Sequence, residues 1–235
     1  MKAIILVGGA GTRLRPVTYE IPKPLVTVKK KPIVNHLIEF FARYGINEVA
    51  LIASVAHETD FMRWKDTWGR ELPIPIAQID LFFEDKPRGT FGMVPSLRNW
   101  IGDKDFVLSN GDELKDLDLS RLIAFHEAQM PLGTIALVKV EKPQEYGVPV
   151  MKGDYIMEFL EKPENPPSDY VSSGLYVLSP KIIDYSDPKK EFVMIEKDIF
   201  PVVAKENKLA GVKFDNARWY DCGSLERWEK AIKEW

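Results

Sequence analysis

The sequence predicts a protein of the α/β class, with a mostly parallel mixed sheet flanked by helices and a small, more antiparallel lobe. Residues 3–7 (Ala-Ile-Ile-Leu-Val) form a short apolar run that is typical of a buried strand and ends at Gly8. Residues 32–44 carry apolar side chains at three- and four-residue spacing and are followed by Gly45, which predicts an amphipathic helix with a glycine cap. Residues 49–53 are apolar again and predict a second buried strand. The order strand, helix, strand predicts a parallel pair with a right-handed crossover.

The alternation of strand and helix patterns continues along the chain. Strands are expected at residues 76–83, 106–108 and 134–140, and helices at residues 90–101, 120–129, 196–206 and 225–235. Pro201 should kink or interrupt the helix in which it lies. Residues 146–176 contain several short apolar runs broken by Pro and Gly, which indicates the more antiparallel lobe. Residues 164–168 are interpreted as a loop rather than a linker, so we expect a single domain over residues 1–235.

Composition excludes several classes of protein. Hydrophobic residues make up 45% and charged residues 29% of the chain, a balance that argues against intrinsic disorder. A net charge of -3 gives no basic field, so no nucleic-acid partner is expected. Cys222 is the single cysteine, which excludes an intramolecular disulfide and a cysteine-rich zinc site. No apolar stretch has the length of a membrane span or a signal-peptide core, so we expect a cytoplasmic protein with no membrane partner. A homo-oligomer stays open.

A glycine-rich loop follows the first predicted strand. Residues 8–16 read Gly-Gly-Ala-Gly-Thr-Arg-Leu-Arg-Pro, and such glycines let the backbone approach an anion closely with its N–H groups. The loop is not a Walker A motif, and Leu14 stands where a dinucleotide-binding fingerprint needs its third glycine. Taken alone, the loop is equally consistent with a simple tight turn. Arg13 adds a cation, and the stiff segment Pro22-Lys23-Pro24 can hold one ammonium group in place.

Together, Gly-Gly-x-Gly-Thr-Arg-Leu-x-Pro and Pro-Lys-Pro-Leu resemble the signature of the sugar-1-phosphate nucleotidyltransferases, also called nucleoside-diphosphate-sugar pyrophosphorylases. The resemblance is nearest to the mannose and heptose 1-phosphate guanylyltransferases, covers nearly the whole chain, and agrees with a Rossmann-like sheet and a sugar-binding lobe. Four later segments fit the family in order: residues 84–90, which resemble the base-reading stretch; Asn110-Gly111-Asp112, with a metal-binding aspartate; Glu145-Tyr146-Gly147 with Glu161-Lys162-Pro163, at the sugar phosphate; and residues 220–224, with the second aspartate.

The resemblance implies roles for individual residues. The catalytic set would be Arg13, Lys23, Asp112, Lys162 and Asp221, with Mg²⁺ as cofactor held by Asp112 and Asp221. The nucleoside triphosphate and the sugar 1-phosphate would be contacted by Leu6, Gly8, Gly9, Ala10, Gly11, Thr12, Glu84, Pro87, Gly89, Thr90, Asn110, Gly111, Gly147, Glu161, Ser172 and Gly174.

These residue types suit the chemistry that the resemblance implies. In nucleotidyl transfer, a phosphate oxygen attacks the α-phosphorus of a triphosphate and expels pyrophosphate. Both reactants are anionic, so the protein must neutralise charge and align them. Two carboxylates suit a hard Mg²⁺ ion, and Arg13, Lys23 and Lys162 supply cations. A sugar phosphate is already ionised, so no general base is needed and the three histidines need no catalytic role.

Two positions bear on substrate choice. The family usually has Asn-Ala-Gly where this chain has Ser172-Ser173-Gly174, which leaves the sugar open. Members that use dTTP or UTP commonly have Gln five residues before the glycine that is here Gly89, whereas this chain has Glu84. An ionised carboxylate only accepts hydrogen bonds and can take both adjacent donors of guanine, so we expect GTP to be preferred. The alternative is that Glu84 points into solvent and backbone groups read the base.

Three other functions are compatible with parts of the pattern. A transferase that uses UTP or dTTP would share every motif. A catalytically silent sensor of nucleotide sugars would be favoured by loss of the charged residues in the signature, but all five of the catalytic set are present. A dinucleotide-dependent oxidoreductase is excluded by the missing third glycine and by the lack of a ribose-binding acid after the second strand.

Overall fold

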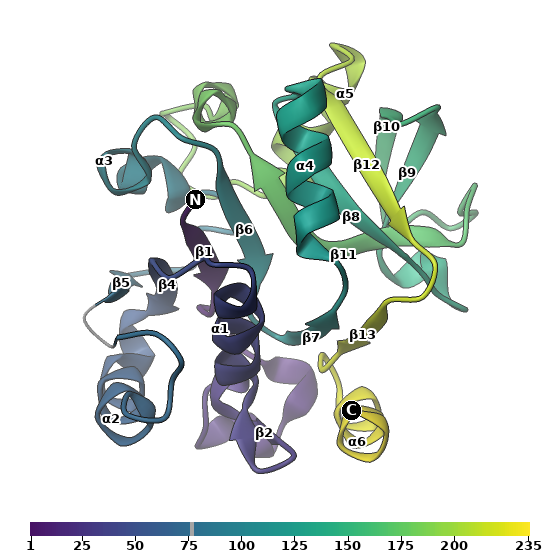
Figure 1. Ribbon diagram of the computed structural model, residues 1–235. Helices are drawn as coiled ribbons and strands as arrows, with labels where there is room; N and C mark the ends of the chain where they lie inside the picture. The colour runs from purple at the N-terminus through teal and green to yellow at the C-terminus, as the bar shows by residue number, and fades with distance from the viewer. Residues whose placement is uncertain (76–77) are drawn as a thin grey trace. The chain divides into compact units, whose positions relative to one another are not determined.

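The computed structural model describes residues 1–75 and 78–235 (Figure 1). The fold is a mixed, mostly parallel sheet of nine strands flanked by helices, with two small two-stranded antiparallel sheets, which confirms the predicted α/β class. The chain divides into two compact units. Unit 1 comprises Met1–Pro87, Ser109–Leu117 and Arg218–Trp235, and unit 2 comprises Arg88–Leu108 and Asp118–Ala217. The single domain over residues 1–235 stays a prediction.

The first part of unit 1 is the predicted parallel arrangement. Strands β1 (Ala3–Leu6), β4 (Val49–Ser54) and β5 (Ile79–Glu84) pair in parallel in the order β5-β4-β1. Helix α1 (Ile33–Arg43) joins β1 to β4 along the chain, and its residues at three- and four-residue spacing are fully buried. The strand predicted at residues 76–83 is found as β5, while residues 76–77 lie outside the described residues.

Helix α2 (Glu58–Trp68) in unit 1 was not predicted. Its only buried side chains are those of Phe61 and Trp64, and charged residues fill most of the remaining positions. The apolar periodicity that identifies α1 is therefore absent from this segment.

Two antiparallel ribbons complete unit 1. Strands β2 (Thr27–Val28) and β3 (Lys31–Pro32) form one, and β7 (Glu113–Asp116) and β13 (Arg218–Asp221) form the other, running side by side in Figure 1. Helix α6 (Leu225–Glu234) follows β13, as predicted, and begins at Ser224, whose side chain accepts a hydrogen bond from the backbone N–H of Arg227. The second ribbon was not predicted, because it joins segments far apart in the sequence.

Unit 2 contains the more antiparallel part of the sheet. Strand β8 (Gly133–Lys139) pairs antiparallel with β11 (Tyr170–Leu178) and parallel with β12 (Leu209–Phe214). Strand β10 (Tyr155–Glu161) pairs antiparallel with β9 (Gly147–Lys152) and with β12, which confirms the antiparallel character expected for residues 146–176. Strand β6 (Phe106–Asn110) leads from unit 2 into unit 1 at Ser109, and the predicted helix at residues 120–129 is α4 (Leu119–Gln129).

Two predicted helices of unit 2 are wrong in extent. The segment 90–101 is helical only at its end, as a 3₁₀ turn at Val94–Leu97 followed by α3 (Arg98–Ile101). The segment 196–206 is a π-helical turn at Ile195–Ile199 followed by α5 (Phe200–Lys205). Pro201 therefore stands at the start of α5, where its missing N–H would have no partner within the helix, rather than inside a longer helix.

Within the described residues, no helix has both the length and the apolar character that crossing a bilayer requires.

Candidate active site

The glycine loop leaves β1 in unit 1, and two of its glycines, Gly8 and Gly11, lie in tight surroundings. A Cβ on Gly8 would lie 2.7 Å from the Glu84 Oε1 atom. Gly11 has φ 61°, and a Cβ there would lie 2.9 Å from Cγ2 of Thr18, whose hydroxyl donates to the Gly11 carbonyl at 2.7 Å. Gly9, Ala10 and Thr12 are exposed, so this stretch of backbone is accessible to an anion.

The ribbon of β7 and β13 brings together the two aspartates. Asp112 directly precedes β7, and Asp221 is the last residue of β13. In the ribbon Asp221 stands opposite Glu113, and the Cys222 N–H donates to the Asp112 carbonyl at 2.9 Å. The two carboxylates, remote in sequence, therefore lie at the same end of one ribbon.

Each aspartate of the pair contacts a cation. The Lys23 ammonium donates to Oδ2 of Asp112, and the Arg227 guanidinium donates to Oδ2 of Asp221. Lys23 is held in place by its neighbours, since its side chain is only 8% exposed although it is a lysine. Arg13 lies at the same place, because a Cβ on Gly223 would be 3.1 Å from its Nη2 atom. Unit 1 thus gathers three cations around two carboxylates.

The two carboxylates differ in their electrostatics. Burial would raise the pKa of Asp112, but the Lys23 ammonium and its hydrogen bond more than offset this, so the pKa lies below its usual value. Burial raises the pKa of Asp221, and the nearby charge of Asp112 raises it further, against the opposing effect of Lys23. The Lys23 ammonium lowers the pKa of both carboxyl groups.

The pair has the donor chemistry that a hard divalent cation prefers. Carboxylate oxygens are the protein ligands that suit Mg²⁺, which keeps several waters and usually binds one or two carboxylates together with substrate phosphates. Across residues 1–75 and 78–235, no group of three or more His, Cys, Asp or Glu side chains could hold a metal ion. Asp112 and Asp221 therefore fit a metal that shares its coordination shell with phosphates.

Glu84 lies at the end of β5, opposite Ser54 at the end of β4. It is 7% exposed, and its Oε1 atom lies against Gly8 of the glycine loop. The alternative in which Glu84 points into solvent is therefore wrong. The carboxylate therefore lies beside the start of the glycine loop.

Asn110, Gly111 and Leu6 connect β6 to β1 within unit 1. The Gly111 N–H donates to the Leu6 carbonyl at 2.9 Å, and a Cβ on Gly111 would lie 2.4 Å from that oxygen. The Asn110 side-chain amide donates to Glu113 Oε1 at 3.0 Å. These three residues set the position from which Asp112 projects.

A second group of predicted residues lies in unit 2. The Thr90 hydroxyl donates to Glu196 Oε2 at 2.6 Å, and the Tyr176 hydroxyl donates to Glu196 Oε1 at 3.3 Å. The Ser172 hydroxyl donates to the Tyr176 hydroxyl oxygen, and the Gly174 N–H donates to the Ser172 hydroxyl oxygen, both at 3.3 Å. One buried network thus links Thr90, Ser172 and Gly174.

The glycine that precedes Thr90 is required by its surroundings. Gly89 has φ 76°, and a Cβ there would lie 2.4 Å from the Val193 carbonyl oxygen.

Gly147, Glu161 and Lys162 meet at one end of the β9–β10 pair in unit 2. Glu161 stands opposite Gly147, and a Cβ on Gly147 would lie 3.2 Å from Glu161 Oε2. The Lys162 ammonium is 3.8 Å from Glu161 Oε1, and its side chain is 58% exposed. Lys162 has φ 52°, an uncommon conformation for a residue with a side chain. Burial raises the pKa of Glu161, against the opposing charges of Lys162 and Lys197.

The predicted site residues therefore form separate groups. Unit 1 holds Leu6, Gly8, Gly9, Ala10, Gly11, Thr12, Arg13, Lys23, Glu84, Pro87, Asn110, Gly111, Asp112 and Asp221, and unit 2 holds Gly89, Thr90, Gly147, Glu161, Lys162, Ser172 and Gly174. The sequence analysis missed Glu113, Lys115, Arg227 and Glu196. No local pattern marks them, because a charged residue becomes conspicuous only when it is found buried against a partner.

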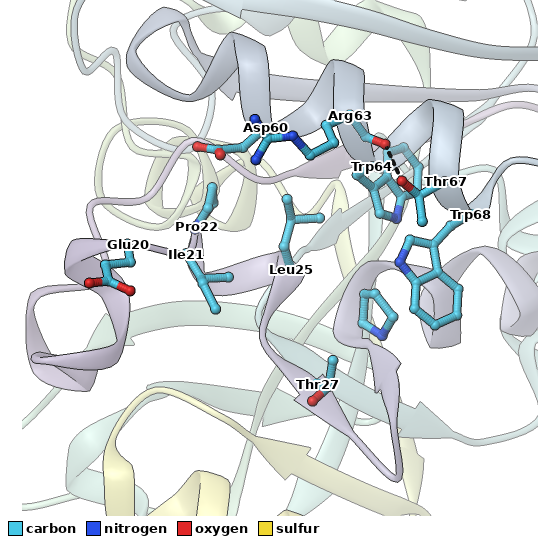
Figure 2. Close-up of a pocket in the computed structure, with 11 residues that line it drawn as sticks. Glu20, Ile21, Pro22, Leu25, Thr27, Asp60, Arg63, Trp64, Thr67 and Trp68 are labelled. Atoms are coloured by element: carbon cyan, nitrogen blue, oxygen red, sulfur yellow. Dashed lines mark hydrogen bonds between the residues drawn. The ribbon is translucent and has the colours of Figure 1, made fainter.

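A pocket in unit 1 lies beside the Lys23 segment. It has a volume of about 240 Å³ and lies between the segment before α1 and helix α2, as Figure 2 shows. Its lining residues are Glu20, Ile21, Pro22, Leu25, Thr27 and Pro32 on one side and Asp60, Arg63, Trp64, Thr67 and Trp68 on the other. Pro22 and Leu25, which flank Lys23, form part of its wall. Among the described residues that line it, none is a predicted site residue, so the pocket is separate from the aspartate pair.

The chain is similar in sequence to known proteins. The chain is 37% identical over 227 residues to a mannose-1-phosphate guanylyltransferase catalytic subunit beta of Xenopus tropicalis, covering 95% of this chain and 61% of that protein. The relative of the same name from Dictyostelium discoideum gives the same values. The chain thus spans about three fifths of the length of these curated relatives.

Solved structures agree on the fold. HddC from Yersinia pseudotuberculosis matches with a TM-score of 0.82 at 26% identity, over 99% of this chain and 98% of that one. A Bacillus anthracis structure has a TM-score of 0.89 at 24% identity, over 99% of this chain and 94% of that one, and shows the fold alone. The model of the nucleotidyl transferase family matches residues 2–234. This match over nearly the whole chain shows that the chain belongs to the nucleotidyl transferase family.

Proposed function

We propose that this protein transfers a nucleotidyl group from a nucleoside triphosphate, preferably GTP, to a sugar 1-phosphate, forming a nucleoside-diphosphate sugar and pyrophosphate. The observation that carries the proposal is the ribbon that joins Asp112 and Asp221 beside Lys23, Arg13 and the glycine loop. The names of the mannose-1-phosphate guanylyltransferase relatives, and a structure of HddC complexed with GMP-PN that is 27% identical to this chain, support it.

The residues of unit 1 would act on the triphosphate. A sugar-phosphate oxygen forms a bond to the α-phosphorus, and the bond to the bridging oxygen breaks, with its electron pair leaving on pyrophosphate. The backbone N–H groups of the glycine loop can cradle the phosphates, and Arg13 and Lys23 can stabilise the charge on the departing oxygens. Because the sugar phosphate is already ionised, none of these residues has to remove a proton.

We propose that Asp112 and Asp221 hold a Mg²⁺ ion. When bound there, the metal would neutralise charge on the phosphates. The carboxylates would orient it, while the cations around them limit the repulsion between the two acids.

For unit 2 we propose the binding of the sugar 1-phosphate. The exposed Lys162 ammonium would hold the phosphate group, and Glu161, opposite Gly147, would accept a hydrogen bond from a sugar hydroxyl. Ser172 and Gly174 would lie along the sugar. We also propose that the protein works in the cytoplasm on these small molecules, supported by its balanced charge and single cysteine.

Pyrophosphate release is expected only when GTP, a sugar 1-phosphate and Mg²⁺ are all present. The reason is that the Mg²⁺ ion held by Asp112 and Asp221 would neutralise charge on the phosphates during transfer. The measurement is pyrophosphate formation over a matrix of nucleoside triphosphates and sugar 1-phosphates, with and without a chelator. Full turnover in chelator would remove the metal from the proposal. GTP binding without turnover on any sugar phosphate would favour a silent sensor instead.

Glu84→Gln is expected to erode a preference for GTP over UTP, CTP and dTTP. The buried carboxylate can accept from both N1–H and the N2 amine of guanine, whereas a Gln amide presents only one acceptor. By analogy with bidentate base reading, the loss should be about 1–3 kcal/mol in kcat/KM discrimination. The measurement is kcat/KM for the four triphosphates. Asp80→Asn is the matched control, because Asp80 is an exposed acid on the same strand. Equal kcat/KM for GTP and UTP in the wild type would end the guanine assignment alone.

A further inference from the structure

Glu113 is a buried acid on the ribbon that carries the two aspartates. Its carboxylate accepts three hydrogen bonds: from Asn110 Nδ2 at 3.0 Å, from Lys115 Nζ at 2.6 Å and from Trp219 Nε1 at 3.0 Å. The side chain of Lys115 is 0% exposed and that of Glu113 is 8% exposed. Every one of these partners lies in unit 1.

The three donors lie on the three strands next to the aspartate pair: Asn110 ends β6, Lys115 is in β7 and Trp219 is in β13. Asn110 precedes Asp112 by two residues on the incoming chain, and Trp219 precedes Asp221 by two residues on β13. Within the ribbon, Glu113 stands opposite Asp221 and Lys115 stands opposite Trp219. The Glu113 carboxylate is therefore hydrogen-bonded both to Asn110, just before Asp112, and to Trp219, just before Asp221.

Stability alone does not account for a buried Glu–Lys pair here. Removing two charges from water is costly, and well-packed apolar residues of similar volume often stabilise a protein as well or better. An apolar pair could not accept hydrogen bonds from Asn110 and Trp219, however. The costly burial of these two charges is therefore explained by the hydrogen bonds through which Glu113 holds Asn110 and Trp219 in place.

We propose that Glu113 is a positioning residue that sets the separation and orientation of Asp112 and Asp221 for a single divalent cation. The inference rests on the proposed function in so far as that cation serves nucleotidyl transfer. Residues that orient metal ligands typically change metal affinity or activity by about 10–100-fold when they are replaced.

The first test is Trp219→Phe, which keeps an aromatic ring but removes the N–H donor to Glu113. Mn²⁺ is the probe, because it prefers the same oxygen ligands as Mg²⁺ and free Mn²⁺ is measured directly by electron paramagnetic resonance. We expect the Kd for Mn²⁺ to rise by about 10-fold. The Mn²⁺ concentration for half-maximal pyrophosphate release should rise in parallel, with an unchanged KM for the sugar phosphate. Trp64→Phe is the matched control. The Trp64 indole N–H donates to Asn35 Oδ1 at 2.7 Å, and this hydrogen bond involves no residue of the ribbon.

A second test separates positioning from stability. Glu113→Gln leaves Lys115 buried without a counter-charge, so Tm should fall. The double variant Glu113→Gln/Lys115→Met removes both charges and should recover Tm. It should still bind Mn²⁺ weakly, because Asn110 and Trp219 donate to different oxygens of Glu113, and the Gln amide replaces one of these oxygens with an NH₂ donor.

The outcomes distinguish the inference from the proposed function. Recovery of both Tm and Mn²⁺ affinity in the double variant would give Glu113 a structural role only and overturn the inference. Trp219→Phe with wild-type Mn²⁺ affinity, or a wild-type protein that binds no Mn²⁺, would also overturn it. If the double variant does not fold, Trp219→Phe decides. A wild type that binds Mn²⁺ but transfers no nucleotide would overturn the proposed function, while weaker binding by Trp219→Phe would still support the positioning role.

Discussion

Asp112→Asn and Asp221→Asn are each expected to lower kcat by about 10²-fold or more, an order of magnitude typical of losing one electrostatic stabiliser. Each change keeps the size of the side chain and removes the charge that would hold the cation. Because the ribbon places both acids at one end, loss of either should be felt by the same metal ion. Pyrophosphate release at saturating GTP and sugar phosphate, across a range of Mg²⁺ concentrations, measures the effect.

The two substitutions should differ in their effect on stability. The pKa of Asp112 is lowered in the folded protein, so its ionised form contributes stability above the unfolded pKa that is lost as pH falls through the folded value. Asp112→Asn should therefore lower Tm slightly near neutral pH. The pKa of Asp221 is raised, so its charge opposes folding, and Asp221→Asn should leave Tm unchanged or higher. Asp116→Asn, on the same ribbon, is the control, and near-normal turnover by either variant would remove that aspartate from the metal site.

Lys23→Met is expected to lower kcat by about 10²- to 10³-fold, comparable with the loss of one preorganised donor from a buried site. The Lys23 ammonium is almost completely buried and lies on Asp112, so its position is fixed before any substrate arrives. Met has a similarly long, unbranched side chain but carries no charge. Steady-state kinetics with GTP and sugar phosphate measure the loss, and Lys230→Met on the exposed face of α6 is the control.

Lys23→Met should also change the pH dependence of activity. Lys23 is the largest influence that offsets the burial of Asp112, so without its ammonium the pKa of that carboxyl should rise. The acid limb of kcat/KM should then move to higher pH, because the carboxylate protonates sooner as pH falls. A variant with normal kcat and an unmoved acid limb would show that Lys23 serves neither the phosphates nor Asp112.

Much of the fold can be predicted from local patterns in the sequence. The apolar run of β1, the periodic face of α1 and the run of β4 identify a parallel unit, because burying one face of each element leaves a regular spacing in the sequence. The glycine loop was equally recognisable, since its glycines follow a strand pattern directly and Gly11 adopts a left-handed backbone conformation that favours glycine. The motif that contains Asp112 and the motif that contains Asp221 also indicated the chemistry, through their resemblance to a family.

Other features arise only when distant segments meet. The ribbon of β7 and β13 pairs strands that show no signal individually, because short strands gain their hydrogen bonds from each other and not from their neighbours in sequence. Helix α2 lacks a periodic apolar face and depends on its packing within unit 1. By contrast, the helix expected at residues 196–206 is divided just before Pro201, between Ile199 and Phe200, which is the interruption predicted from that proline.

By itself, the sequence determined the parallel α/β unit, the glycine loop and the residue types of an anion-handling site, because these depend on local periodicity and local backbone geometry. Only the tertiary structure decided that Asp112 and Asp221 share one ribbon, that Lys23 and Arg227 contact them, and that Glu113 joins the two strands. Burial is what gives a charged side chain its partner and its shifted pKa. Whether a charged side chain is buried depends on the whole chain, so no local pattern reveals it.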